Sequence, residues 1–138
     1  MRNKISPDKK TIVLIDDATI KKLKEAFREE SQTIIHCNYV SKRKYTNGGW
    51  VNIYPTTFLQ SNKNSDVLKM QHAENIPLSP DVHVFSKVGE LKSFVLYFPA
   101  IPKDWDEFSL IEKTTTAEGF VVRNIKRNNV GVYEIYLS

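Results

Sequence analysis

The sequence predicts a mainly β domain, an antiparallel sandwich or a distorted barrel with one amphipathic helix near its N-terminus. Short runs of β-branched and aromatic residues recur between turn residues at close spacing, which is typical of antiparallel all-β folds rather than of alternating strands and helices. The length of 138 residues, with 41% hydrophobic and 26% charged residues, is that of one globular domain. We therefore expect a flexible arm over 1–10 and a single β-sandwich domain over 11–138.

The expected strands are apolar runs that end at proline, glycine or polar turn residues. The main ones cover 33–41, 50–55, 94–98, 108–112, 119–125 and 131–137, with shorter candidates at 11–15 and 82–85. Between them, the irregular stretch 60–81 is long for a connection, which indicates a crossing between sheets or a functional loop. Within it, residues 67–73 are expected to form one or two helical turns.

A β-hairpin is expected around Asn47-Gly48. Both residue types adopt the positive φ angles that a tight hairpin turn requires. The two strands joined by this turn would be 33–41 and 50–55, the second ending at Pro55, whose missing N–H cannot join a sheet ladder.

A single helix is expected at about 18–30, because Asp16 and Asp17 are good N-cap residues and an apolar residue follows at helical spacing. The apolar stripe consists of Ile20, Leu23 and Phe27. Lysine, arginine and glutamate occupy the remaining positions, so this stripe is expected to face the core.

The core is expected to form from the closing strands. Phe94, Leu96 and Phe98 share one strand face by the two-residue period. On the following strands the corresponding apolar positions are Phe120, Val122, Val132 and Ile135. We expect Leu96, Phe98 and Phe120 to be largely buried.

Three segments, 94–103, 108–112 and 119–125, resemble the closing half of certain bacterial immunoglobulin-like sandwich modules. In those modules a strand ending in an F-P-x-I/L-P turn leads to a strand ending in Glu, and then to a final strand led by Gly-Phe. The resemblance covers residues 94–125 and implies an immunoglobulin-like β-sandwich serving as an accessory domain. Such modules are common outside the cytoplasm. No catalytic residue is carried over by the resemblance.

The net charge of +4 lies in the N-terminal third of the chain, where basic residues adjoin aromatic ones. Tryptophan and tyrosine bury large areas at low entropic cost and are enriched at binding surfaces. The candidate binding surface is therefore Lys42, Arg43, Lys44, Tyr45, Trp50, Tyr54 and Trp105. These residues could bind a protein or stack on single-stranded nucleic acid, and the aromatic ones could equally be cross-strand packing pairs.

Catalytic and metal-binding patterns are weak. Cys37 is the single cysteine and lies in an apolar run, where it is expected to be packed and unreactive. Its neighbour His36 should point to the opposite strand face, and the other two histidines, His72 and His83, are distant in sequence. The carboxylates around Trp105 suggest a sugar-cleaving pair or, more simply, an acidic turn. We expect no catalytic residue, metal or cofactor.

The sequence thus favours a non-enzymatic protein-interaction or accessory module, with a nucleic-acid-binding β domain using the basic N-terminal third as the alternative. An enzyme or a small-ligand carrier ranks after both. No apolar run reaches the roughly 20 residues that span a bilayer. The N-terminus has the charges but not the apolar stretch of a signal peptide, so the chain is expected to stay where it is made unless a leader was removed.

Overall fold

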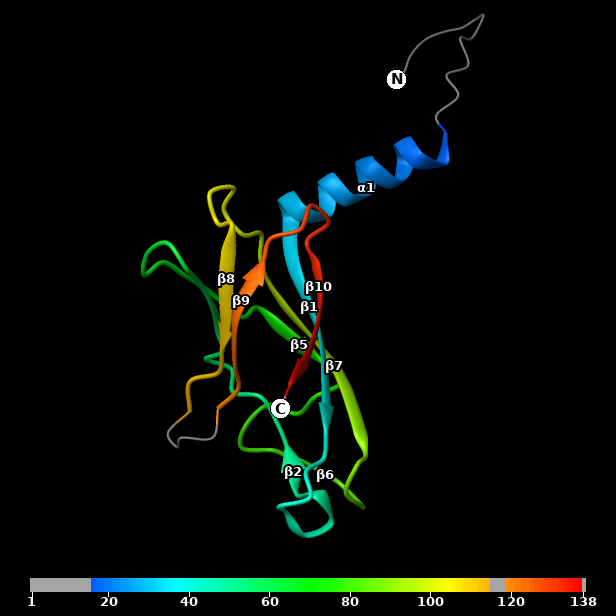
Figure 1. Cartoon of the computed structure of the whole chain (residues 1–138), viewed down its shortest axis with the longest axis vertical. Helices are drawn as coiled ribbons and strands as arrows, with labels where there is room; N and C mark the ends of the chain where they lie inside the picture. Colours follow the sequence, from blue (N-terminus) through cyan, green and yellow to red (C-terminus); the bar gives the residue numbers. More distant parts are fainter. Residues whose placement is uncertain (1–15, 115–118, 138) are drawn as a thin grey trace, which may run out of the picture.

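The computed structural model describes residues 16–114 and 119–137 and is mainly β, as predicted (Figure 1). Helix α1 (Asp17–Ser31) leads directly into strand β1 (Gln32–Val40). The expected strand at 11–15 and the arm lie outside the described residues. The remaining strands are β2 (Trp50–Val51), β3 (Phe58–Ser61), β4 (Val67–Lys69), β5 (His72–Glu74), β6 (His83–Val84), β7 (Leu91–Pro99), β8 (Glu107–Ile111), β9 (Val121–Lys126) and β10 (Val132–Leu137).

The strands form two four-stranded sheets and a two-stranded ribbon. The first sheet has the order β10-β1-β7-β5, the second sheet has the order β4-β3-β8-β9, and the ribbon pairs β2 with β6. In Figure 1 strands β8 and β9 lie on one side of the molecule, and β1, β7 and β10 lie on the other. The ribbon lies at the end of the body opposite α1.

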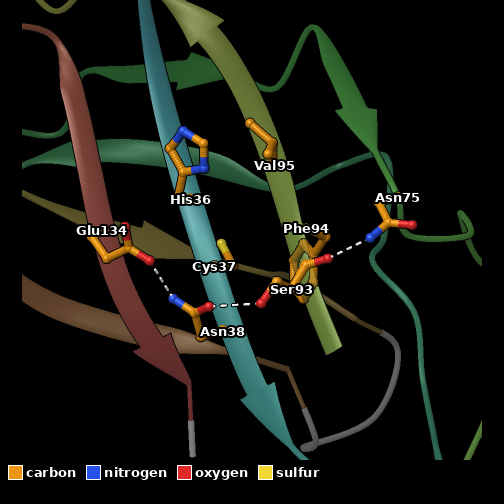
Figure 2. Close-up of a pocket in the computed structure, with 8 residues that line it drawn as sticks. All are labelled: His36, Cys37, Asn38, Asn75, Ser93, Phe94, Val95 and Glu134. Atoms are coloured by element: carbon orange, nitrogen blue, oxygen red, sulfur yellow. Dashed lines mark hydrogen bonds between the residues drawn. The ribbon is translucent and has the colours of Figure 1, made fainter. Parts of the chain in front are cut away.

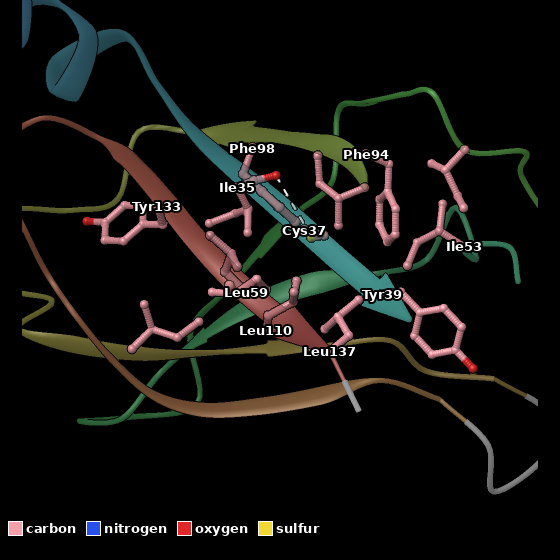
Figure 3. Close-up of a cluster of buried hydrophobic side chains, with 14 of the residues drawn as sticks. Ile35, Cys37, Tyr39, Ile53, Leu59, Phe94, Phe98, Leu110, Tyr133 and Leu137 are labelled. Carbon is pink, nitrogen blue, oxygen red and sulfur yellow. Dashed lines mark hydrogen bonds between the residues drawn. The ribbon is translucent and has the colours of Figure 1, made fainter. Parts of the chain in front are cut away.

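One hydrophobic core fills the space between the two sheets (Figure 3). Alternate side chains of β1, β7 and β10 point inward and meet those of β3 and β8. The rings of Phe108 and Tyr133, one from each sheet, pack edge to face with centroids 5.1 Å apart. Phe94, Leu96 and Phe98 are buried as predicted, whereas Phe120 is only partly buried.

The predicted hairpin between 33–41 and 50–55 is wrong. Strand β1 pairs with β7 along one edge, from Gln32 opposite Pro99 to Val40 opposite Leu91, and with β10 along the other. Because both edges of β1 are occupied, β2 pairs with β6 instead. The Asn47-Gly48 sequence does adopt positive φ angles, but within a short 3-10 helix (Thr46–Gly48).

The first sheet is mixed rather than purely antiparallel. Strand β10 runs parallel to β1, with Ile34 opposite Val132 and Tyr39 opposite Leu137. The other ladders between the strands are antiparallel. A parallel neighbour requires a long connection, and here most of the chain separates the two strands. Local turn signals therefore did not predict this pairing.

Residues 67–73 form strands rather than the expected helical turns. Strand β4 pairs with β3 in the second sheet, and β5 pairs with β7 in the first. The chain therefore crosses between the sheets inside the long connection 60–81, which is one of the two explanations expected for its length. Pairing at two sheet edges overrides the weak local preference of this segment.

Helix α1 begins as predicted, but two residues of its apolar stripe, Ile20 and Leu23, do not pack on the core. Thr19 N–H donates to Asp16 Oδ1 at 2.7 Å, which caps the first turn. Ile20 and Leu23 are 37% and 60% exposed, because the helix extends away from the sheets (Figure 1). The Phe27 side chain lies outside what the structure describes. Among the described residues, no helix combines the length and apolarity needed to cross a bilayer.

Replacing Phe98 by Ala is expected to lower the free energy of unfolding by about 3–5 kcal/mol, since its ring is fully buried in the hydrophobic core. Urea unfolding followed by circular dichroism measures this loss. The matched control is Leu91→Ala on the same strand, which is 59% exposed and should cost under about 1 kcal/mol. A loss below about 1 kcal/mol for Phe98→Ala would contradict the assigned core.

Candidate binding groove

A groove of about 700 Å³ lies among the end of β1, the chain around β2, and residues 112–114 and 119–120, which follow β8 and precede β9. Five aromatic residues line it together with two lysines and one carboxylate. These are Tyr39, Tyr45, Trp50, Tyr54, Phe120, Lys42, Lys44 and Glu112. The groove is therefore aromatic along its walls and carries more positive than negative side chains.

The loop that carries the lysines is held in place at Ser41, which is 3% exposed. Ser41 Oγ donates to the Lys87 carbonyl at 2.7 Å and accepts from the Glu90 N–H at 2.8 Å. Gly48 packs against this contact so tightly that a Cβ would lie 2.6 Å from the Lys87 carbonyl oxygen. Glycine at this position, with φ of +87°, therefore lets the loop close against the turn before β7.

The aromatic walls differ in exposure. Tyr39 is buried, and its ring meets the Phe120 ring edge to face at 5.5 Å between centroids. By contrast, Tyr45 and Trp50 are 37% and 56% exposed. The inner wall is thus a fixed packing pair, and the outer wall presents aromatic surface to solvent.

Each groove lysine lies over a tyrosine ring. Lys42 Nζ is 5.8 Å from the centroid of Tyr39, and Lys44 Nζ is 5.0 Å from that of Tyr45. Such cation–π contacts hold an ammonium group against the face of the ring. Both lysines therefore place positive charge along the aromatic wall.

The carboxylate of Glu112 joins the two sides of the groove and is 5% exposed. Its Oε2 accepts from the Tyr54 N–H at 2.9 Å, and its Oε1 accepts from the Phe120 N–H at 3.0 Å. Burial raises the pKa of this carboxyl above its ordinary value of 4.5, while the two backbone hydrogen bonds oppose the shift. Because both oxygens are already engaged by the main chain, Glu112 is a structural bridge rather than an available acid or base.

Gly119 lets the segment before β9 come close to the end of β8 at this bridge. A Cβ on Gly119 would lie 2.1 Å from the Glu112 carbonyl oxygen, which is far inside contact distance. The Glu112 N–H in turn donates to the Phe120 carbonyl at 2.8 Å. The Glu that ends β8 and the Gly-Phe that precedes β9 therefore act as one structural unit.

The groove brings together five of the seven residues expected on the binding surface: Lys42, Lys44, Tyr45, Trp50 and Tyr54. Arg43 is exposed on the same loop but does not line the groove. Placing Trp105 on this surface was wrong, because its side chain is 1% exposed in the core. The turn at Trp105 is closed by its N–H to the Pro102 carbonyl, and Arg127 Nη1 donates to that same carbonyl at 2.6 Å.

Among the groove residues that sequence reasoning did not place on the binding surface are Tyr39, Glu112 and Phe120. The last two belong to the Glu and Gly-Phe positions that carry the resemblance to immunoglobulin-like modules. That pattern was the available signal, but it did not indicate that the two positions share a groove with the basic loop. Tyr39 lies in a strand, and the alternation of side chains along a strand predicts which residues share a face. It does not predict that Tyr39 lines a groove.

A second, smaller depression of about 250 Å³ lies on the first sheet (Figure 2). Its polar side chains bind one another: Asn38 Nδ2 donates to Glu134 Oε2 at 2.7 Å, and Ser93 Oγ donates to Asn38 Oδ1 at 2.8 Å. Asn75 Nδ2 completes the network with the Ser93 carbonyl at 2.7 Å. The network ties β10, β1 and β7 together across the sheet.

Cys37 and His36 point to opposite faces of β1, as predicted. His36 is exposed, whereas Cys37 is 1% exposed and faces the core. Burial, with a smaller contribution from the charge of Glu134, raises the pKa of the Cys37 thiol to about 12. In the described part of the chain, no three His, Cys, Asp or Glu side chains are arranged to hold a metal ion.

Comparison with protein-family models, with curated proteins and with solved structures found no match for this chain.

The stability contributed by Glu112 is expected to depend on pH. The folded state holds the Glu112 proton more tightly than the unfolded chain does, because its pKa is raised on folding. As pH rises from the ordinary pKa of 4.5 through the raised folded value, wild type should lose free energy of unfolding relative to Glu112→Gln, which cannot titrate there. Urea unfolding of both proteins across this pH range measures the difference. A pH-independent difference would contradict the raised pKa.

Cys37 is expected to resist iodoacetamide in the native state, because alkylation requires an accessible thiolate. Mass spectrometry should find the intact thiol after incubation at neutral pH and full labelling after unfolding in urea. Native labelling at the rate of an exposed cysteine would show that the β1 face is assigned wrongly.

Proposed function

We propose that this chain is a non-enzymatic interaction module with an immunoglobulin-like β-sandwich fold, which binds another protein through the groove. The observation that carries the proposal is the position of exposed aromatic surface, at Trp50 and Tyr45, beside two lysines held over tyrosine rings. Tryptophan and tyrosine are enriched at protein-binding surfaces. The resemblance over residues 94–125 supports the same fold and an accessory role.

The chemistry of the groove supports binding rather than catalysis. Its carboxylate, Glu112, accepts two backbone hydrogen bonds and is kept from solvent. A general acid or base has to reach a substrate proton, and a nucleophile needs a neighbouring base. Among the described groove residues the other ionisable side chains are lysines and tyrosines, which suit recognition of anionic and apolar groups.

Nucleic-acid binding is the second candidate, because the same lysines and aromatic rings line one groove. Bases stack on exposed aromatic rings, and lysines neutralise phosphates with a strong dependence on salt. Two lysines supply a small electrostatic contribution for this kind of binding. We therefore rank it below protein binding and include it in the test.

Photo-crosslinking in extracts of the native host tests the proposal. With benzoylphenylalanine in place of Trp50, we expect protein adducts that survive nuclease treatment, because this side chain is exposed in the groove. The matched control places benzoylphenylalanine at Tyr136, which is 77% exposed on β10 and does not line the groove. Adducts removed by nuclease would favour the second candidate. Equal labelling from both positions, or no labelling, would contradict both.

A further inference from the structure

Among the described residues, strand β2 has a strand neighbour on one side only, β6, and its residues line the groove. In the ribbon, the Phe85 N–H donates to the Gly49 carbonyl at 2.9 Å, and Trp50 lies opposite Val84. Further along, Ile53 donates its N–H to the Pro77 carbonyl and accepts from the Ser79 N–H. The Gly49 carbonyl and both main-chain groups of Ile53 therefore point toward β6 and the segment around 77–79. The odd position between them, Val51, lies opposite His83 of β6.

Main-chain groups alternate in direction along an extended chain, so the groups of Trp50 and Asn52 point away from β6. The next position of the same parity, Tyr54, donates its N–H to Glu112 Oε2 on the groove side. All three residues line the groove, where Trp50 is 56% exposed and Asn52 is 8% exposed. Among the described residues, no main-chain hydrogen bond is formed by Trp50 or Asn52 on this side.

An extended peptide is the ligand that such an edge recognises. A strand laid beside β2 would exchange hydrogen bonds with the N–H and C=O groups of Trp50 and Asn52, about 4.8 Å from the β2 main chain. Its alternate side chains would meet the aromatic surfaces of Trp50, Tyr54 and Phe120. Nucleic acids lack the alternating amide groups that pair with a strand edge, so this feature favours a protein segment over an oligonucleotide.

The charge of the groove selects the chemistry of that segment. Lys42 and Lys44 are held against tyrosine rings in the groove, and Arg43 is exposed on the same loop. Among the described residues that line the groove, the one with a negative charge is Glu112, which is buried and accepts hydrogen bonds from backbone N–H groups. Acidic residues flanking an apolar or aromatic one would therefore complement the groove.

We propose that the groove binds an extended acidic segment of a partner protein as a strand added to the free edge of β2. This inference rests on the proposed function and specifies both the geometry and the chemistry of the ligand. The edge supplies affinity through main-chain hydrogen bonds, the aromatic walls receive alternate side chains, and the lysines select acidic flanks.

The test uses the full chain labelled with ¹⁵N and the blocked peptide Asp-Glu-Val-Thr-Phe-Thr-Val-Glu-Asp. We expect saturable binding below about 1 mM. The amides of Trp50 and Asn52 should shift and become protected from hydrogen exchange, while that of Ile53, already bonded to the Pro77 carbonyl, should change little. Two further peptides carry N-methyl groups on alternate residues. One of these two peptides should bind at least about tenfold more weakly than the unmethylated peptide, and the other should bind nearly as well. The reason is that only alternate amides of the peptide face the edge of β2.

A charge exchange provides the second arm. Lys42→Glu with Lys44→Glu should weaken the acidic peptide at least about tenfold and improve binding of its counterpart with Lys in place of Asp and Glu. Absence of binding by the acidic peptide, or equal effects of both N-methyl parities, would overturn the inference. Displacement of the peptide by a mixed single-stranded oligonucleotide at physiological salt would also overturn it. If protein adducts still form at position 50 in any of these cases, the proposed function stands and only the added strand fails.

Discussion

The buried carboxylate of Glu112 is the contact on which the groove depends. A buried ionisable group is costly unless hydrogen bonds satisfy it, and here backbone N–H groups from two different segments do so. One comes from Tyr54, beyond β2, and the other from Phe120, ahead of β9. The same residue's main chain pairs with Phe120, and Gly119 leaves room for that approach. The second sheet is thereby joined to the segment that leaves the ribbon.

The two sheets provide the rigid frame behind this contact. Strand β1 is enclosed by β7 and β10, and its inward side chains meet those of β3 and β8 in one core. Tyr39, near the C-terminal end of β1, lines the groove. Ser41 then holds the loop that carries Lys42 and Lys44 against the turn before β7. The lysines therefore lie on a short loop with both ends anchored. Side chains placed in this way lose less conformational entropy on binding than those on a free loop.

The groove combines features that separately would carry little information. Exposed aromatic rings, a pair of lysines and an open strand edge each occur widely on protein surfaces. Together they address three different parts of one ligand: its side chains, its charge and its main chain. Both carboxylate oxygens of Glu112 accept main-chain hydrogen bonds. The polar network on the first sheet is satisfied internally and ties strands together. This is why the groove, rather than that depression, carries the proposed function.

Local physical chemistry determined much of this protein from the sequence alone. The Asp16 cap, the strand at 94–98 with its buried face, and the opposite directions of His36 and Cys37 follow from capping and the two-residue strand period. Five of the seven expected surface residues meet in the groove because they lie within one stretch of chain, 42–54. Only the tertiary structure decided that β2 pairs with β6, that β10 lies parallel to β1, and that Trp105 is buried. Each of these depends on which sheet edge or core surface is already occupied by a distant segment. The residues next to a strand in sequence do not indicate which distant segment pairs with it. For the same reason, the position of Glu112 in the groove follows from the tertiary structure and not from the local sequence.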